Sequence, residues 1–208
     1  SGSSDSRTKY YFADFNGDGD ADRVYWNYNS QFKIQLGNGD GTFDSTIESS
    51  GSSDSRTKYY FADFNGDGFA DRVYWNYNSQ FKIQWGNGDG TFDSSIESSG
   101  SNKSTTKFYF ADINGDGFAD RVYWDYTDRD ATNTYNGPLR ISLGNGDGTF
   151  GDYMELSGSR LSTTKFYFAD FNGDGFADNV YWNYTRRDAT DTYNGPLRIS
   201  LGNGDGTF

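Results

Sequence analysis

Cysteine and histidine are both absent from this chain of 208 residues. Without cysteine, no disulfide can stabilise the fold, and the redox state of the compartment leaves no trace in the sequence. Without histidine, the chain lacks the commonest general base and the commonest ligand of transition metals. Catalysis would require a carboxylate pair or a metal-bound water, and no such pair stands out. We therefore expect a protein that is not an enzyme.

Proline and long apolar runs are also scarce. The chain has 2 prolines, and hydrophobic residues make up only 33% of it. No run of about 18 apolar residues exists, so we expect no membrane-spanning helix. Aromatic residues, in contrast, reach 19%, and each buried ring removes about 150–250 Å² from water. A core built from rings is therefore expected, with tight turns at many of the 27 glycines.

The charge is strongly acidic, with 30 acidic residues, 18 basic residues and a net charge of −12. Nucleic acid requires a basic face, so we expect no nucleic-acid partner. Much of the acid lies in the stretch DFNGDGDAD at 14–22, which recurs with small changes at 63–71, 112–120 and 170–178. A cation is the partner that fits this pattern best.

The four acidic stretches mark an internal repeat. Asp14, Asp63 and Asp112 are 49 residues apart, and Asp170 follows 58 residues after Asp112. The longer spacing arises because the third and fourth repeats carry an insertion in place of NYNSQFKIQ. We expect one repeat domain over 1–208, with repeats at approximately 1–49, 50–98, 99–156 and 157–208.

Each repeat has the alternating pattern of β-strands and no helical period. In the first repeat the expected strands are TKYYFAD at 8–14, RVYWNY at 23–28, FKIQLG at 32–37 and a weaker run, TFDSTIES, at 42–49. Four short strands in about 50 residues fit one β-propeller blade, and a solenoid of stacked hairpins is the competing arrangement. The expected fold is all-β: a propeller of four tandem four-stranded blades of about 49–58 residues.

The end of the printed sequence leaves the fourth blade short. Phe208 is equivalent to Phe43, which precedes the fourth strand of the first repeat. That blade would then have an unpaired edge. Three alternatives follow: four blades close into one ring, a second chain completes the ring, or the polypeptide is longer.

The acidic loop has the composition of a calcium site. In the first copy, side-chain oxygens stand at positions 1, 3, 5 and 9, in Asp14, Asn16, Asp18 and Asp22. Ca²⁺ takes about 6–8 oxygen ligands, and the backbone carbonyl of Asp20 with a water would complete that number. An EF-hand is excluded, because its loop needs Glu at position 12, where this chain has Tyr25, and because the flanks are strands.

The repeat resembles the FG-GAP/VCBS family of extracellular calcium-binding β-propeller repeats, found in integrin α-subunit heads and in secreted bacterial proteins. The resemblance lies in YFADFNGDGDADRVYW and in LGNGDGTF, at 36–43 and later in each unit. It implies about four Ca²⁺ ions, one in the hairpin between the first and second strands of each blade. The implied ligand positions are Asp14, Asn16, Asp18, Asp20, Asp22, Asp63, Asn65, Asp67, Phe69, Asp71, Asp112, Asn114, Asp116, Phe118, Asp120, Asp170, Asn172, Asp174, Phe176 and Asp178, where Asp20 and the three Phe would act through backbone carbonyls.

The motif GNGDGTF could also hold a metal, through Asp40, Asp89, Asp147 and Asp205. One carboxylate per copy is too few for a metal cage, and a tight turn into the next strand is the favoured interpretation.

Calcium in these loops is expected to be structural, so the function should lie elsewhere. Extracellular calcium modules work with dissociation constants of about 10⁻⁴–10⁻³ M, which favours a secreted or cell-surface protein. The inserted hairpins, roughly 125–140 and 183–198, gather rings with Asp, Asn and Arg, a composition suited to carbohydrate, although a solvated hairpin explains it equally well. The candidate ligand-binding residues are Tyr126, Arg129, Tyr135, Asn136, Tyr184, Arg187, Tyr193 and Asn194.

Two functions follow from this pattern. The first is a calcium-stabilised recognition module that binds carbohydrate or a protein, as lectins and adhesins do. The alternative is a structural protein that self-assembles into a shared ring or filament through the unpaired blade edge.

Overall fold

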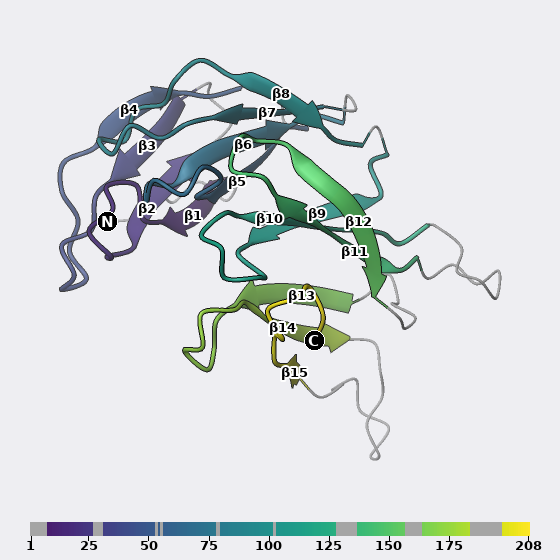
Figure 1. Ribbon diagram of the computed structural model, residues 1–208. Helices are drawn as coiled ribbons and strands as arrows, with labels where there is room; N and C mark the ends of the chain where they lie inside the picture. Colours follow the sequence, from purple (N-terminus) through teal and green to yellow (C-terminus); the bar gives the residue numbers. More distant parts are fainter. Residues whose placement is uncertain are drawn as a thin grey trace, which may run out of the picture. The chain divides into compact units, whose positions relative to one another are not determined.

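The computed structural model describes residues 8–26, 31–52, 54, 56–77, 80–101, 103–127, 137–156, 164–183 and 197–208. These residues contain fifteen β-strands and no helix (Figure 1). It follows that no helix of the described chain is long and apolar enough to cross a membrane.

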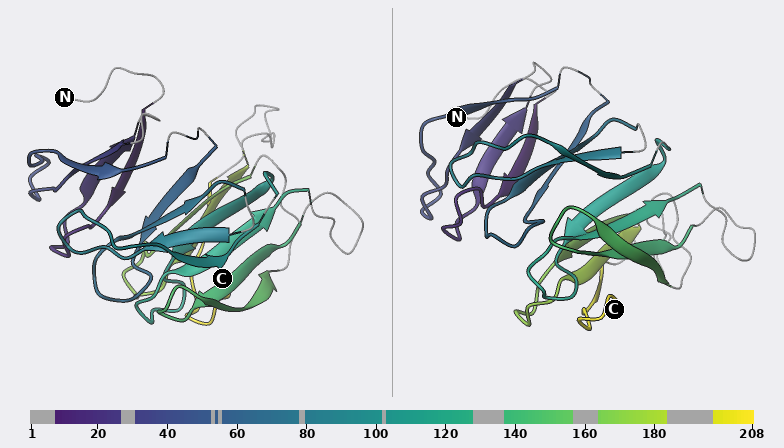
Figure 2. Two further views of the ribbon diagram at one scale, coloured as in Figure 1. Left: turned by 90° about the horizontal axis from the view of Figure 1, so that it is seen from above. Right: turned by 45° about the horizontal axis from the view of Figure 1, so that its top comes forward.

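The chain divides into two compact units, Ser1–Asn102 and Lys103–Phe208. The first unit contains two antiparallel sheets of four strands, each made by one repeat. Figure 2 shows these two sheets, purple to blue, side by side. Their strands are β1 Lys9–Ala13, β2 Asp22–Trp26, β3 Gln31–Gln35 and β4 Ile47–Ser50, then β5 Lys58–Ala62, β6 Asp71–Trp75, β7 Gln80–Gln84 and β8 Ile96–Ser99.

The second unit repeats this plan, and its strands other than β15 are longer than those of the first unit. One sheet has four strands, and the other has three in the described part of the chain. The strands are β9 Thr106–Ala111, β10 Asp120–Asp125, β11 Leu139–Gly144 and β12 Phe150–Leu156, then β13 Thr164–Ala169, β14 Asp178–Asn183 and β15 Arg198–Ser200. Four successive sheets of this kind are propeller blades 1 to 4, so the β-propeller is confirmed and the solenoid is excluded.

One expected strand differs from the structure. The run at 42–49 is not continuous, because Phe43 makes an isolated bridge with Gly37 and β4 begins only at Ile47. In blade 3 the equivalent strand, β12, is continuous from Phe150 and meets β11 across an irregularity between Ser142 and Gly144. In blade 1, Asp44 N still donates to Leu36 O at 2.9 Å. The chain therefore reverses direction between β3 and β4 although no continuous strand pairing runs through this turn.

Each blade has two apolar faces, because side chains alternate along a strand. In the first unit, Phe15, Phe32 and Ile34 of blade 1 form one cluster with Tyr59 and Ala70 of blade 2. The rings meet edge to face: the centroids of Phe32 and Tyr59 are 4.4 Å apart at 84°. Aromatic pairs of this geometry contribute about 0.5–1.5 kcal/mol beyond the area they bury.

The second unit has an equivalent core. Ile113, Leu139 and Ile141 of blade 3 pack with Phe166 and Ala177 of blade 4. The expected core of aromatic rings is therefore confirmed, and it lies between blades as well as within them.

Candidate functional site

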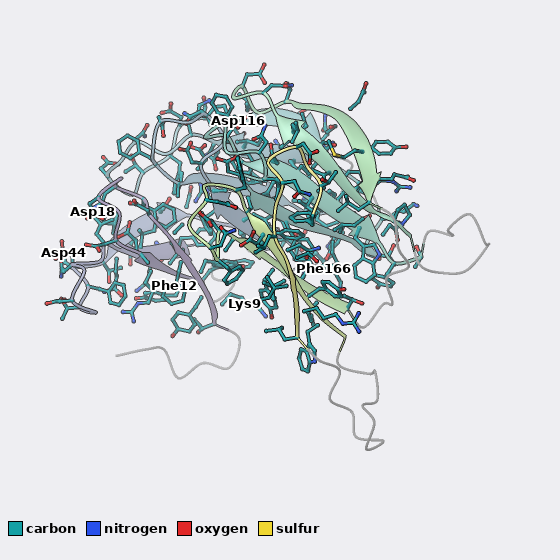
Figure 3. All side chains as sticks on the ribbon, turned by 60° about the horizontal axis from the view of Figure 1, so that its bottom comes forward. Lys9, Phe12, Asp18, Asp44, Asp116 and Phe166 are labelled. Carbon is teal, nitrogen blue, oxygen red and sulfur yellow. The ribbon has the colours of Figure 1, made fainter. Side chains whose placement is uncertain are left out.

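Each acidic loop joins the first and second strands of its blade, as the sequence predicted. Figure 3 labels Asp18 in the loop of blade 1 and Asp116 in the loop of blade 3. The first loop turns sharply at Gly17 and Gly19, whose φ values are 73° and 86°. Glycine adopts such angles without the steric cost that a side chain brings.

The side chains at positions 1, 3 and 5 bond within their own loop. Asp14 accepts hydrogen bonds from Gly17 N at 2.7 Å and Gly19 N at 2.9 Å. Asp18 accepts from Asp20 N at 2.8 Å and from Asn16 Nδ2 at 2.7 Å. The loops of the other blades repeat these bonds, among them Gly66 N to Asp63, Gly115 N to Asp112, and Gly173 N to Asp170.

The aspartate at position 9 has a different role. Asp22 is fully buried, and its carboxylate accepts from Phe15 N at 2.6 Å and from Gly37 N at 2.7 Å. It therefore fastens the start of the acidic loop to the chain just after β3. The equivalent residues Asp71, Asp120 and Asp178 make the same two bonds in blades 2, 3 and 4.

Burial disfavours the charge on the carboxylates of Asp22, Asp71 and Asp120, and it raises the pKa of each. It raises the pKa of Asp71 to about 7 and that of Asp120 to about 6, although two N–H donors oppose the rise in each case. Repulsion from Asp67 and Asp63 raises the pKa of Asp71 further. The acidic side chains of a loop are thus close enough to repel one another, which a bound cation would relieve.

The donor set of these loops fits Ca²⁺ by type. As they stand, no three acidic side chains in the described chain are grouped to hold an ion. Each carboxylate oxygen nevertheless has two lone pairs, and the loop N–H groups at Asp14 occupy one on each oxygen. Hard oxygen ligands and glycines that let the backbone wrap are what a calcium loop requires.

Position 7 of the acidic loop, which is Phe69 in blade 2 and Phe176 in blade 4, has a role that the sequence did not reveal. The Phe69 ring of blade 2 lies so close to Gly17 of blade 1 that a Cβ there would be 2.9 Å from Phe69 Cε1. Next to the ring, Ala70 N donates to Asp14 O at 2.8 Å. Phe176 and Ala177 make the same contacts with Gly115 and Asp112 in the second unit. An acidic loop is therefore part of the junction with the next blade.

The motif GNGDGTF forms a tight turn in the structure. Asp40 accepts from Thr42 N at 2.9 Å and from Thr42 Oγ1 at 2.6 Å, while Asn38 N donates to Thr42 O at 3.2 Å. Asp89, Asp147 and Asp205 have the same arrangement. The four copies therefore serve as turns.

Most of the candidate ligand-binding residues lie outside the described residues: Arg129, Tyr135, Asn136, Tyr184, Arg187, Tyr193 and Asn194. Only Tyr126 is described. It is half-buried, its ring centroid lies 5.8 Å from that of Trp124, and Lys107 Nζ lies 5.6 Å from its ring. These contacts place Tyr126 in the packing at the end of β10.

A pocket of about 390 Å³ lies in the first unit, where blades 1 and 2 meet. Its volume is within the usual range of small-molecule sites. Both aromatic and polar residues line it: Ser50, Gly51, Ser52, Tyr59, Arg72, Tyr74 and Gln84.

Arg72 organises this pocket. It is 4% exposed, and its guanidinium donates to Ser50 O at 2.7 Å and, through Nη2, to Gln84 Oε1 at 2.7 Å. The same group lies 4.4 Å from the centroid of the Phe92 ring, a cation–π geometry. Arg72 thus joins strand β6 of blade 2 to the end of β4 in blade 1.

The two tyrosines form the apolar part of the pocket. Their ring centroids lie 6.0 Å apart, and the Tyr59 hydroxyl accepts from Ser52 N at 2.7 Å. Burial raises the pKa of Tyr59, so its hydroxyl stays protonated.

Sequence reasoning missed this pocket. One signal was available, since Arg72 and Gln84 face each other on adjacent strands, whereas the third and fourth repeats have Ser142 and Ser200 in place of that Gln. No periodicity could show that the pair lies beside the preceding blade.

Comparison with known families gives one match. The model of the FG-GAP-like repeat family matches residues 14–74 and 63–123, which together exceed half of the chain. A comparison with curated proteins found no match.

Solved structures show the same fold. A structure that explains the specific recognition of non-reducing terminal N-acetylglucosamine by an Agrocybe aegerita lectin is 24% identical, with a TM-score of 0.65 over 97% of this chain. A Photorhabdus luminescens Tc holotoxin pore is 20% identical, with a TM-score of 0.63 over 95% of this chain. The chain spans 50% of the lectin chain and 10% of the toxin chain.

Proposed function

Since this chain belongs to the FG-GAP-like repeat family, we propose that it is a carbohydrate-binding propeller module, secreted or on the cell surface, and stabilised by Ca²⁺. Binding rather than catalysis is the proposed activity. The pocket between blades 1 and 2 is the observation that carries the carbohydrate part of the proposal.

The pocket has the two kinds of surface that a sugar needs. A sugar ring presents apolar C–H groups on its faces and hydroxyls at its edge. Tyr59 and Tyr74 supply aromatic surface, while Gln84, Ser50 and Ser52 supply hydrogen-bonding groups. A small number of placed polar groups beside apolar walls is the usual composition of a specific site.

The relative of known specificity guides the choice of the first ligand. The Agrocybe aegerita lectin recognises terminal N-acetylglucosamine, and its likeness to this chain is one of fold. N-acetylglucosamine is therefore the first sugar to titrate, followed by an array of other glycans.

Replacement of Tyr74 by alanine is expected to weaken sugar binding at least tenfold, or about 1.4 kcal/mol. Tyr74 is half-buried in the pocket wall, so its loss removes the surface on which the sugar would stack. Titration calorimetry with N-acetylglucosamine or the best array ligand measures the change. Tyr153→Ala is the control, because this exposed ring on β12 does not line the pocket. Absence of binding to any glycan, with and without Ca²⁺, would refute the proposed function.

The calcium part of the proposal depends on the acidic loops. Oxygen donors and glycines with positive φ recur in the acidic loops of all four blades, and the acidic side chains repel one another in the loops of blades 1, 2 and 3. Because Asp14 O and Asp112 O each accept a bond from the next blade, an ion in either loop would also stabilise a blade junction. If the loops bind Ca²⁺ with the expected dissociation constant of about 10⁻⁴–10⁻³ M, they fill only at the calcium concentration found outside cells. This requirement supports the proposed location.

Removal of calcium is expected to lower the Tm by roughly 10–24 °C. Four sites at ten times their Kd contribute about 5–6 kcal/mol, and each kcal/mol shifts the Tm of a chain of this size by about 2–4 °C. Thermal unfolding in Ca²⁺ and in excess EDTA measures the effect. Calorimetry should also count four ions in the native chain and three in Asp67→Ala, whereas Asp89→Ala, in the exposed turn, should keep four. An unchanged Tm in EDTA would contradict the calcium proposal and leave the sugar proposal standing.

A further inference from the structure

The two blade junctions that lie inside the units follow one pattern, in which the trailing face of one blade packs on the leading face of the next. In the first unit the trailing face of blade 1 contributes Phe15, Phe32 and Ile34, and the leading face of blade 2 contributes Tyr59 and Ala70. These trailing side chains are no more than 1% exposed, and Tyr59 and Ala70 are each 5% exposed. The second unit builds the same junction between blades 3 and 4.

Blade 1 exposes its own leading face, defined here as Tyr10, Phe12 and Ala21. Tyr10 is 40% exposed, whereas Tyr59 at the same repeat position is 5% exposed. Phe12, labelled in Figure 3, is 62% exposed, and Ala21 is exposed whereas its equivalent Ala70 is buried.

Blade 4 exposes the opposite, trailing face. Phe171 is 56% exposed, against 1% for the equivalent Phe15. Ile199 is also 56% exposed, against 0% for Ile34. The trailing face of blade 4 is defined here as Tyr167, Phe171, Leu197, Ile199 and Leu201, all of which are more than half exposed.

The two exposed faces account for nearly all of the strongly exposed apolar side chains in the described chain. Of the eight large hydrophobic residues in that class, only Tyr153 lies elsewhere. Soluble monomers rarely expose contiguous apolar patches of this kind without a binding role. One patch is the leading half of a blade junction, and the other is the trailing half.

We propose that the trailing face of blade 4 binds the leading face of blade 1 in a second copy of this chain. In a pair of copies the contact forms twice, head to tail, which closes the assembly. The two internal junctions show that these repeat positions pack on each other, and the repeats present similar apolar side chains at them. The inference does not depend on sugar binding.

The main-chain groups of the two faces are also complementary. Inside each unit, the N–H at the end of one acidic loop donates to the carbonyl of the first aspartate in the preceding loop, as Ala70 N does to Asp14 O. In the proposed contact Ala21 N would donate to Asp170 O of the other copy. Gly173, beside that acceptor, has nothing within 4 Å of its Cβ position, whereas Gly17 and Gly115 are each covered by a ring.

Two copies would also give a reasonable number of blades. Each chain has four, and propellers usually contain about 4–8.

Asp20 is the residue that separates this contact from the internal junctions. Phe69 and Phe176 fill the same repeat position with a ring against the glycine of the preceding loop, and Asp20 supplies no ring. Asp20→Phe is therefore expected to lower the dimer dissociation constant about tenfold or more, because it restores that apolar burial.

The test is the mass of the full chain in Ca²⁺, measured by light scattering at concentrations up to about 0.1 mM. We expect about twice 23.3 kDa. Phe12→Glu and Ile199→Glu each place a charge in one face and should give the monomer mass, while Tyr153→Glu, at an equally exposed ring, should leave the dimer intact. Because both faces are exposed, each variant should keep the Tm of the isolated chain; Leu197→Glu replaces Ile199→Glu if that variant fails to fold.

Mixing separates the proposed contact from general stickiness. Phe12→Glu retains a native trailing face and Ile199→Glu retains a native leading face, so an equimolar mixture should recover a heterodimer that neither variant forms alone. A monomeric native chain, variants that remain dimeric, or a mixture without recovery would each overturn the proposal. A mass that rises steadily with concentration would overturn the closed pair of copies.

Discussion

Replacement of Asp71 by alanine is expected to lower the free energy of unfolding by about 2–6 kcal/mol in excess EDTA, where a bound cation contributes nothing. The carboxylate of Asp71 is fully buried and accepts from Phe64 N and Gly86 N, both at 2.8 Å. Alanine leaves both buried N–H groups without this acceptor, and each unsatisfied donor costs about 1–3 kcal/mol. Denaturant unfolding measures the loss.

The matched control for this substitution is Asp89→Ala. Asp89 lies in an exposed turn and bonds only within it, to Thr91, so its loss should change stability by less than about 1 kcal/mol. Asp71→Asn is the second comparison. The amide oxygen of asparagine can accept from one of the two N–H groups, whereas its amide NH₂ group is a donor and cannot accept from the other. We expect an intermediate loss for it. Equal stabilities for Asp71→Ala and the native chain would show that the two bonds do not hold the loop.

Replacement of Gly86 by alanine is expected to lower the free energy of unfolding by about 2–4 kcal/mol. A Cβ on Gly86 would lie 2.6 Å from Ala70 O, a backbone atom that cannot turn aside as a side chain can. Relief of that contact would also move Gly86 N away from Asp71, which it now reaches at 2.8 Å. Thermal or denaturant unfolding tests the prediction.

Gly151→Ala is the control, because its Cβ would meet only Leu143 O, at an ordinary 3.8 Å. Alanine there should leave stability unchanged or raise it by up to about 1 kcal/mol, since alanine loses less backbone entropy than glycine on folding. If Gly86→Ala and Gly151→Ala behaved alike, close approach at Gly86 would not matter. The equivalents Gly37, Gly144 and Gly202 approach the carbonyls of Ala21, Ala119 and Ala177 in the same way.

These two substitutions show where sequence reasoning about the acidic loop stopped. The residue types and spacing predicted oxygen ligands at position 9, and calcium binding there stays a prediction. The structure adds that Asp22, Asp71, Asp120 and Asp178 each accept from an N–H group at the end of the third strand or just after it. That donor is 15 or 24 residues distant in sequence, and no local pattern joins the two.

Local sequence determined the strands, turns and loops of this protein. Period-two alternation placed Val24 and Trp26 on one face of β2, and paired glycines with positive φ set the acidic loops and the turns. These features depend on backbone geometry and nearest neighbours, so a repeat carries them in its own residues.

Tertiary structure alone decided which faces are covered. Tyr10 and Tyr59 stand at the same position of near-identical repeats, yet they are 40% and 5% exposed. The alternation gives every blade two apolar faces, but burial is a property of the blade that packs against each face. A repeat therefore encodes its two faces and their fit, and only the assembled chain shows that the leading face of blade 1 and the trailing face of blade 4 are exposed.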